Sequence, residues 1–399
     1  MRGALQVEIS LCKYCLEREG IKAHAAKSCD LCNGLLGRLD SRANDIIENL
    51  SDYEYETFLI GATIPQSVLD REDELRSRLK IKGKESVKSQ ITRMLTKKIS
   101  KSTGKRADYS RPDITVLLSL SDGVISINPR SIWISARYTK LRRGISQRES
   151  DCKNCNGLGC AACNYLGKSG ENIQSVATRF FCKKFDSDSC NFIWLGSEDQ
   201  NSLVEGSGRP FYVEVLRPKK RLATKYRSKF KTRLSYKSAD LKISKVERLE
   251  KRITEVPQFD VKCVVHLIRK DNDTPQELNA EEIQRNFQDA VVNVRLSRKY
   301  RVVQRRIYSI SAKITNASQN AELLIECEGG IPLKKLITGQ DNSVEPNLSN
   351  LLMQYQIDQE KPFDILDVRI KKPRPKQGRR GREPPITEVA EIEELSEDA

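Results

Sequence analysis

Two adjacent carboxylates, Glu198 and Asp199, are the side chains whose surroundings most clearly suggest chemistry. They lie in a loop that is followed by a second, glycine-rich loop over 206–210 and by an alternating segment over 211–216 that is typical of a strand. The next segment, 217–234, contains nine Lys or Arg residues and no acid. An acidic turn beside a basic run indicates a carboxylate held where polyanionic RNA can reach it.

Eight of the twelve cysteines form two quartets, each made of two C-x-x-C pairs. Two thiolates at this spacing can bind one tetrahedral ion, and the second pair closes the site, so we predict one structural zinc ion in each quartet. Redox-active or unliganded thiols are the alternative for the first quartet, and an empty hinge is the alternative for the second. The second quartet, with its C-x-x-C-x-G-x-G form, resembles the zinc repeats of DnaJ-type chaperones. The predicted ligands are Cys12, Cys15, Cys29 and Cys32, and Cys152, Cys155, Cys160 and Cys163.

The composition favours a nucleic-acid partner. The 399 residues carry a net charge of +16, with 38% hydrophobic and 31% charged residues. The seven positive charges of 371–382 cancel the seven negative charges of 383–399, so the excess belongs to the rest of the chain. A basic body neutralises phosphates and releases counterions, whereas the alternative is a merely soluble basic surface. No apolar run of about 18 residues predicts a membrane span, and 1–10 lacks a signal-peptide core, so we expect a cytoplasmic protein without a membrane partner.

The catalytic-loop region carries a resemblance to a known family. Gly-Ser-Glu-Asp at 196–199 and Gly-Arg-Pro-Phe at 208–211 resemble the catalytic loop of the archaeal-type tRNA pseudouridine synthases called Pus-ten. This family joins a zinc-bearing THUMP region to a synthase domain and acts on the T-arm of tRNA. The resemblance implies that Asp199 is the catalytic carboxylate and that Arg209 binds substrate. The wider superfamily reads Gly-Arg-x-Asp here, and Ser197 stands in place of that Arg; Glu198 is interpreted as a bystander.

A second motif follows in the chain. The segment 328–337 resembles a synthase motif that usually reads Gly-x-Tyr-Ile-Lys-Glu, with Pro332 in place of the Tyr. The resemblance implies that Lys334 pairs with Asp199 and that Leu333 and Leu366 shape the uracil pocket. The superfamily also places a Tyr against the target base. The corresponding segment 260–265 has none, which leaves Tyr300 or Tyr308 as substitutes, or a site that works without a Tyr.

The elements that must position these residues predict a multidomain α+β fold. Apolar residues at helical spacing over 87–99 predict a helix, and strands are expected over 114–120, 124–127 and 132–136. A charged helix is expected over 241–253. The helix, the hairpin and the basic segment 137–144 resemble a THUMP domain, a module that binds tRNA, and the alternative is a generic α+β domain. The expected parts are a zinc-binding module (1–35), a THUMP-like tRNA-binding domain (36–149), the second cysteine quartet and linker (150–169), a mixed-sheet pseudouridine synthase domain (170–372) and a disordered tail (373–399).

Two functions therefore remain open on the sequence. The first is a tRNA pseudouridine synthase that acts at positions 54 and 55 of the T-loop, with structural zinc and no organic cofactor. The second is a catalytically silent, zinc-containing tRNA-binding protein. A THUMP methyltransferase is disfavoured because no glycine-rich cofactor loop follows a strand. In either case we predict RNA contacts from Lys219, Lys220, Arg221, Arg142 and Arg143.

Overall fold

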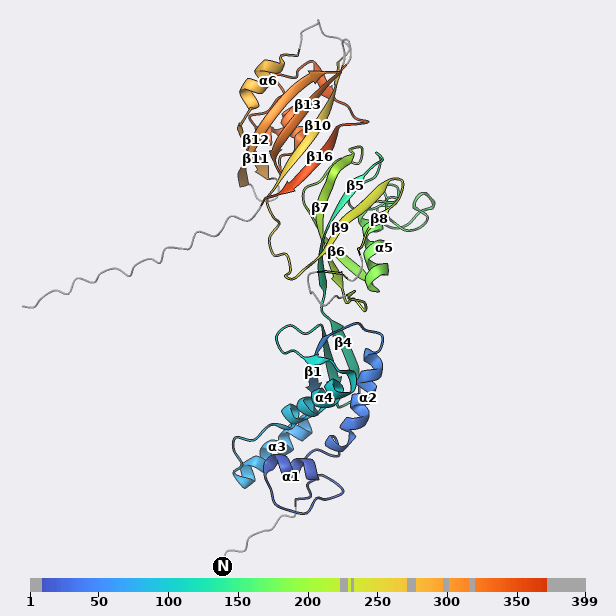
Figure 1. Ribbon diagram of the computed structural model, residues 1–399, viewed down its shortest axis with the longest axis vertical. Coiled ribbons are helices and arrows are strands. Elements are labelled where there is room, and N and C mark those ends of the chain that lie inside the picture. The colour runs from blue at the N-terminus through green and yellow to red at the C-terminus, as the bar shows by residue number, and fades with distance from the viewer. Residues whose placement is uncertain are drawn as a thin grey trace, which may run out of the picture.

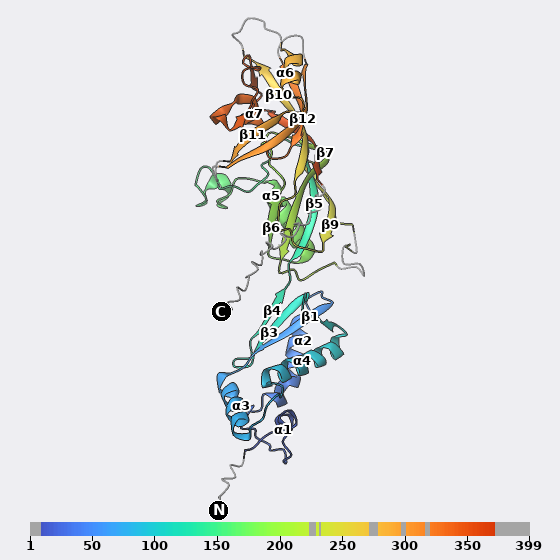
Figure 2. The ribbon, with the colours of Figure 1, turned by 90° about the vertical axis from the view of Figure 1, so that its left-hand side faces the viewer.

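The computed structural model describes residues 9–222, 229–230, 233–270, 278–296, 301–315 and 320–371. It is elongated, with an N-terminal part below and a larger C-terminal part above in the views of Figures 1 and 2. The predicted tail, Tyr300 and much of the basic run lie outside the described residues. Within the described residues, no helix is long and apolar enough to cross a membrane.

The N-terminal part is a four-stranded mixed sheet with helices packed beside it. Strand β1 runs parallel to β2 and β3, β4 is antiparallel to β3, and the order is β2-β1-β3-β4. The elements are α1 (Lys13–Glu19), η1 (Leu36–Arg38), α2 (Leu39–Leu50), β1 (Thr57–Thr63), α3 (Gln66–Leu79), α4 (Val87–Thr103), β2 (Arg106–Ala107), β3 (Ile114–Ser119) and β4 (Ile125–Pro129).

Helix α4 confirms the predicted helical spacing. Val87, Ile91, Leu95 and Ile99 are all buried, as residues four positions apart on one helix face must be if that face packs on a sheet. Ser86 caps the start of the helix by accepting a hydrogen bond from the Ser89 N–H (3.1 Å). The first cysteine quartet belongs to the same hydrophobic core as α4 and β1, so 9–35 and the sheet pack as one body.

The C-terminal part is built on a twelve-stranded mixed sheet within the described residues. The strand order is β14-β11-β12-β13-β10-β16-β7-β5-β9-β8, with β15 added to β10 and β6 added to β7. The strands are β5 (Ile132–Lys140), β6 (Ser189–Trp194), β7 (Val204–Leu216), β8 (Tyr236–Lys237), β9 (Leu241–Leu249), β10 (Phe259–Arg269), β11 (Val291–Leu296), β12 (Arg301–Ile314), β13 (Asn320–Glu328), β14 (Val344–Glu345), β15 (Tyr355–Ile357) and β16 (Phe363–Ile370). The helices are η2 (Ala161–Cys163), α5 (Ile173–Phe185), α6 (Ala280–Phe287), α7 (Leu333–Thr338) and η3 (Gln340–Asn342).

Two sequence-based expectations are wrong. The sequence predicts that the THUMP-like module extends to residue 149, but β5 (Ile132–Lys140) pairs with β7 and β9 of the large sheet. The Asn-Pro-Arg-Ser segment at 128–131 therefore connects the N-terminal part to the C-terminal part. Local sequence cannot distinguish such a connection from a bend within one strand. The helix predicted over 241–253 is strand β9, because its buried residues Leu241 and Ile243 alternate with exposed charges at the period of a strand.

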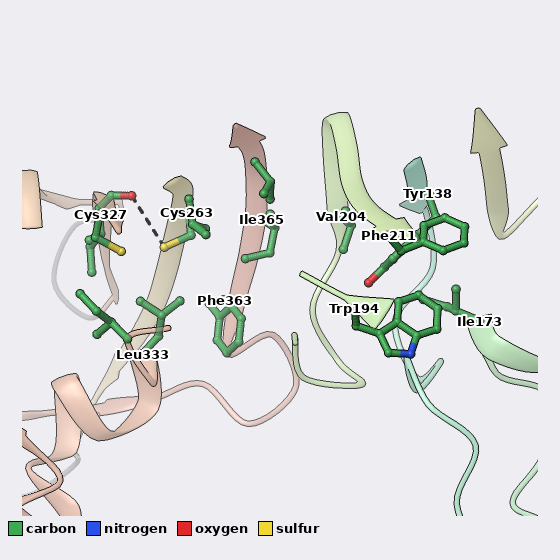
Figure 3. Packing of buried hydrophobic residues seen from close by; sticks show 14 of the residues in the cluster. Tyr138, Ile173, Trp194, Val204, Phe211, Cys263, Cys327, Leu333, Phe363 and Ile365 are labelled. Carbon is green, nitrogen blue, oxygen red and sulfur yellow. Dashed lines mark hydrogen bonds between the residues drawn. The ribbon is translucent and has the colours of Figure 1, made fainter. Parts of the chain in front are cut away.

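The large sheet consists of two halves that meet at a narrow seam. Strands β16 and β7 run parallel there and share one bridging pair, Ile365 with Val204. The Ile365 N–H donates to the Leu203 carbonyl at 3.0 Å. Buried side chains line both sides of this seam, with Leu333, Phe363 and Cys263 on one side and Trp194, Phe211 and Tyr138 on the other (Figure 3). The seam places the loop 195–203, which connects β6 to β7, at the centre of the sheet.

Candidate active site and cysteine clusters

A cavity of about 500 Å³ opens at the seam between the two half-sheets. The loop 195–203 forms one wall, and the segment 327–335, which ends in the first turn of α7, forms the opposite wall. The ends of β10 and β16 contribute Phe259, Val261, Phe363 and Ile365. Both predicted motifs therefore face the same space although more than a hundred residues separate them.

Asp199 and Lys334 are in direct contact across this cavity. Lys334 Nζ lies 2.6 Å from Asp199 Oδ2, and the Asn201 N–H donates to Asp199 Oδ1 at 2.9 Å. Burial raises the pKa of the Asp199 carboxyl, but the hydrogen bonds from Lys334 and Asn201 and the charges of Lys334 and Lys140 outweigh it, so the pKa is lowered overall. The site thus holds an ionised, partly exposed carboxylate at neutral pH.

Three cations, from β5, the segment just after it and β7, hold the backbone of the loop 195–203. Lys140 is fully buried, and its Nζ donates to the carbonyls of Ile145, Asp199 and Gln200 at 2.9, 3.0 and 3.0 Å. Burial is the main reason that the pKa of Lys140 is lowered to about 8. Arg209 donates to the Leu195 and Ser197 carbonyls, and Arg143 donates to the Asn201 carbonyl. Sequence reasoning missed Lys140, although its place in a strand two residues after the buried Tyr138 gave a signal.

Glu198, interpreted from sequence as a bystander, is a buried structural residue. Its side chain is 0% exposed and forms an ion pair with Arg209 (Nε to Oε2, 2.8 Å). Tyr138 donates its hydroxyl to the same carboxylate at 2.7 Å. Burial, together with the Glu198 charge, raises the pKa of Tyr138 well above its usual value, so the hydroxyl stays protonated. The neighbouring side chains of the turn point in different directions, so that Glu198 is buried in the protein and Asp199 faces the cavity. Arg209, predicted to bind substrate, is among the residues that line the cavity but is 1% exposed, and its guanidinium donates to carbonyls of the loop.

The apolar walls differ in part from the predicted ones. Leu333 lines the cavity as predicted, but Ile365 rather than Leu366 comes from β16. A bulge in the β10–β16 pairing at this point leaves Leu366 out of the register, which no sequence pattern revealed. Tyr308 is not among the residues that line the cavity, and its hydroxyl donates to Asp260 at 2.9 Å. The aromatic residues in the cavity are Phe259 and Phe363, and Phe259 directly precedes the segment 260–265 in which the sequence places no Tyr.

The five predicted RNA-contacting residues fall into two groups. Lys220 and Arg142 are exposed and Lys219 is half-buried, so they remain candidates. Arg143 instead forms a bidentate pair with Asp364 at 2.7 and 2.6 Å, which ties the loop to β16. Arg221 is 2% exposed and lies against Asp113 of the N-terminal part. A basic run in sequence does not reveal that these two arginines contact carboxylates inside the protein, and their contact with RNA stays a prediction.

Both cysteine quartets have the geometry of a tetrahedral metal site. The ligand atoms within each quartet lie within 4.8 Å of one another, and the closer sulfur pairs are 3.7–3.9 Å apart. Four sulfurs at about 2.3 Å from a zinc ion are about 3.8 Å apart, so the thiols fit zinc. In the second quartet, Gly159 has φ +92°, and a Cβ there would lie 2.8 Å from the Tyr165 carbonyl oxygen. The knuckle therefore requires glycine at this position.

These features define a class of protein: a THUMP domain followed by a mixed sheet with an ion-paired aspartate in its central cavity. Comparison with known proteins agrees with this description. Residues 42–119 match the family described as the archaeal Pus10 THUMP domain, and 133–369 match the Pus10 C-terminal family. The chain belongs to the Pus10 family.

Curated relatives cover most of the chain. The tRNA pseudouridine synthase Pus10 of Nitrosopumilus maritimus (strain SCM1) is 31% identical over 363 residues, which cover 87% of each chain. The protein of the same name from Cenarchaeum symbiosum (strain A) is 29% identical over 81% of this chain and 77% of its own. That of Korarchaeum cryptofilum (strain OPF8) is 27% identical over 86% of this chain and 93% of its own.

We expect two zinc ions per chain by elemental analysis of the purified protein. Cys15→Ser should lose one ion and unfold the N-terminal core, because zinc binding contributes on the order of 10 kcal/mol in small finger peptides. Cys155→Ser should lose the other ion and leave that core intact. Cys190→Ser, which lies outside both quartets, should retain both ions. Purified wild-type protein without zinc would refute the assignment.

Glu198→Gln should destabilise the protein by about 3–5 kcal/mol, because Arg209 would remain buried without its counter-charge. The free energy of unfolding from urea titration measures this effect. Glu205→Gln is the matched control, since Glu205 lies nearby in the chain but is exposed, and it should change stability by less than about 0.5 kcal/mol. Equal stabilities for the two variants would contradict the structural role of Glu198.

Proposed function

We propose that this chain converts uridine to pseudouridine in tRNA, with Asp199 as the catalytic carboxylate. As a Pus10 family member it is an isomerase of the tRNA pseudouridine synthase kind. The observation that carries the assignment of Asp199 is its 2.6 Å contact with Lys334 inside the central cavity. The resemblance extends the proposal to uridines 54 and 55 of the T-loop. A cytoplasmic location is part of the same proposal.

The conversion of uridine to pseudouridine requires few chemical groups, and the cavity supplies a suitable carboxylate. The N1–C1′ bond of uridine breaks, the base turns, and a C5–C1′ bond forms while C5 loses a proton and N1 gains one. No electron is transferred and no group is donated, so the reaction itself requires no organic cofactor. An ionised carboxylate beside the sugar can attack C1′ or remove a sugar proton, and Asp199 suits either role because Lys334 keeps its pKa low.

The size and walls of the cavity suit an extruded nucleotide. An enzyme that acts on a base inside folded RNA must take that base out of its stack. About 500 Å³ between the loop and α7 accommodates a uridine, and Leu333, Ile365 and Val261 supply apolar contacts for the ring. Phe259 presents an aromatic ring at the same cavity, on which a uracil can stack. Because Phe259 has no hydroxyl, it can stack on the base but cannot transfer a proton.

Asp199→Asn should bind unmodified tRNA with wild-type affinity and form no pseudouridine, because the change removes the charge and keeps the shape. Lys334→Met should lose at least about a hundredfold in rate while staying folded, since the acid loses its partner. Tritium release from C5-labelled uridine in tRNA measures both. Asp188→Asn, at an exposed carboxylate, is the control and should retain full activity.

The same assays separate a pseudouridine synthase from a catalytically silent tRNA-binding protein. A wild-type protein that releases no tritium but binds tRNA well would favour the catalytically silent reading. An active wild type with an equally active Asp199→Asn variant would end the assignment of this residue. Transcripts changed one uridine at a time identify the target positions.

The reaction rate at saturating tRNA should be constant from about pH 5.5 to 7 and fall above about pH 8. Asp199 is ionised throughout this range because its pKa is lowered. Lys140, with a pKa of about 8, loses a proton and with it one of its three donated hydrogen bonds, two of which go to carbonyls of the loop. Glu198, Asp199, Arg143 and Arg209 are the charged groups around Lys140.

The contribution of Lys140 to folding stability should change with pH in the opposite direction to its contribution to the rate. Between about pH 8 and 10.5 the unfolded chain binds more protons at this lysine than the native chain, so its contribution to stability rises with pH. Activity falls over the same range. Single-turnover rates and urea unfolding across this range measure the two effects. Lys140→Met should lower the rate and abolish the alkaline decline, and a decline unchanged in that variant would reject Lys140 as its source.

A further inference from the structure

A second cavity, of about 350 Å³, lies where the two parts of the protein join, and arginines dominate its lining. They come from four separate segments: the loop before β3, the β4–β5 connection, the segment after β7, and the end of β9 with the residues that follow it. Trp133 of β5 adds a half-buried aromatic ring. The arginines are Arg111, Arg130, Arg221, Arg248 and Arg252. This cavity shares no lining residue with the catalytic cavity.

The positive charge in this junction pocket exceeds the negative charge that lines it. Two carboxylate residues, Glu214 and Glu250, face five arginines. Asp113, just outside, is shared by Arg130 (2.9 Å) and Arg221 (3.5 Å). The pocket therefore leaves positive charge for an anion to neutralise.

Arg221 is almost completely buried, yet one of its N–H donors makes no hydrogen bond among the described residues. It is 2% exposed, and its Nη1 donates to the Arg130 carbonyl at 2.9 Å. Its Nε lies 3.5 Å from Asp113 Oδ1 but makes no hydrogen bond among the described residues, and neither does the Nε of Arg130. A buried donor without a hydrogen-bond partner is costly in a protein interior, and an anion in the pocket would satisfy it. Burial lowers the pKa of Arg221 to about 10, which still leaves it cationic at neutral pH.

We propose that the junction pocket binds a phosphate group of the tRNA backbone. Arginine forks match phosphate oxygens in pairs, and their convergence suits a phosphate better than a planar carboxylate of an acidic peptide. Trp133 offers a face on which the adjoining ribose or base can pack. The identity of the ligand as tRNA rests on the proposed function, whereas the phosphate chemistry rests on the arginines alone.

The pocket serves a part of the tRNA remote from the target uridine. Strand β5 begins at the pocket with Ile132 and ends with Lys140, which contacts the Asp199 carbonyl. At about 3.3 Å per residue, the strand separates the two sites by roughly 25 Å. The arginines also belong to both parts of the protein, so a bound phosphate would brace the junction that Glu54 already fastens through the Arg221 and Leu222 N–H groups.

Arg111→Ala/Arg252→Ala tests the proposal, with Lys251→Ala as the matched control. Lys251 lies beside Arg252 and carries the same charge as each replaced arginine, but it does not line the pocket. We expect the double variant to bind an unmodified tRNA transcript about tenfold more weakly. The slope of log Kd against log salt should become shallower by about one unit per lost phosphate contact. The rate at saturating tRNA should stay at the wild-type value because the target is roughly 25 Å away. Lys251→Ala should bind within about twofold of wild type.

A folded double variant with the affinity and salt slope of Lys251→Ala would overturn the proposal and leave the arginines a structural role. If the variant does not fold, modification of the wild-type protein by an arginine-specific dicarbonyl decides. tRNA should protect Arg252 and Arg111 from modification and leave the exposed Arg179 of α5 reactive. Protection by millimolar inorganic phosphate and none by tRNA would reject RNA as the source. A wild type that shows the protection but forms no pseudouridine would refute only the proposed activity.

Discussion

The active-site loop depends on buried positive charge. Lys140 and Arg209 are almost completely removed from water, and with Arg143 they donate to five backbone carbonyls between Leu195 and Asn201. Buried cations are tolerated only where acceptors and counter-charges satisfy them. Glu198 supplies the counter-charge for Arg209, and Asp364 supplies it for Arg143. The loop is therefore fixed by interactions that would be lost together if it moved, so Asp199 is presented in one position without being buried itself.

The same interactions join the two halves of the sheet. Strands β7 and β16 share one bridging pair, which is too little to hold two half-sheets in register. Asp364 of β16 adds a bidentate contact with Arg143, accepts from the Leu203 N–H at 2.7 Å, and lies 3.0 Å from His266 Nε2. Burial raises the pKa of Asp364, but the contacts with His266 and Arg143 lower it well below its usual range. One carboxylate thus connects the segment after β5, β10, β16 and the loop at the point where the cavity opens.

Local sequence predicted features whose cause is local. The C-x-x-C spacing brings sulfurs together within one knuckle, and the spacing of Val87, Ile91 and Leu95 specifies a helix face. The resemblance of the two motifs to a known family predicted that Lys334 pairs with Asp199, and the two side chains are in contact. Features that depend on partners distant in the chain were missed. Arg143 and Arg221 resemble any surface arginine until Asp364 and Asp113 are placed beside them, and the crossing at Arg130–Ser131 reads like a bend within one strand. Leu366 loses its expected place to Ile365 through a bulge that only pairing with β10 defines.

The position of Ser197 follows from this arrangement. In the resembling superfamily the residue before the x-Asp pair is an arginine, and here the cationic functions of the loop come from elsewhere in the chain. Arg209 donates to the Ser197 carbonyl from below, and Lys334 contacts Asp199 from across the cavity. An ionised acid requires a nearby positive charge, but electrostatics does not specify which residue carries it. Lys334 and the buried Lys140 both lower the pKa of Asp199, so the carboxylate remains charged with a serine at position 197.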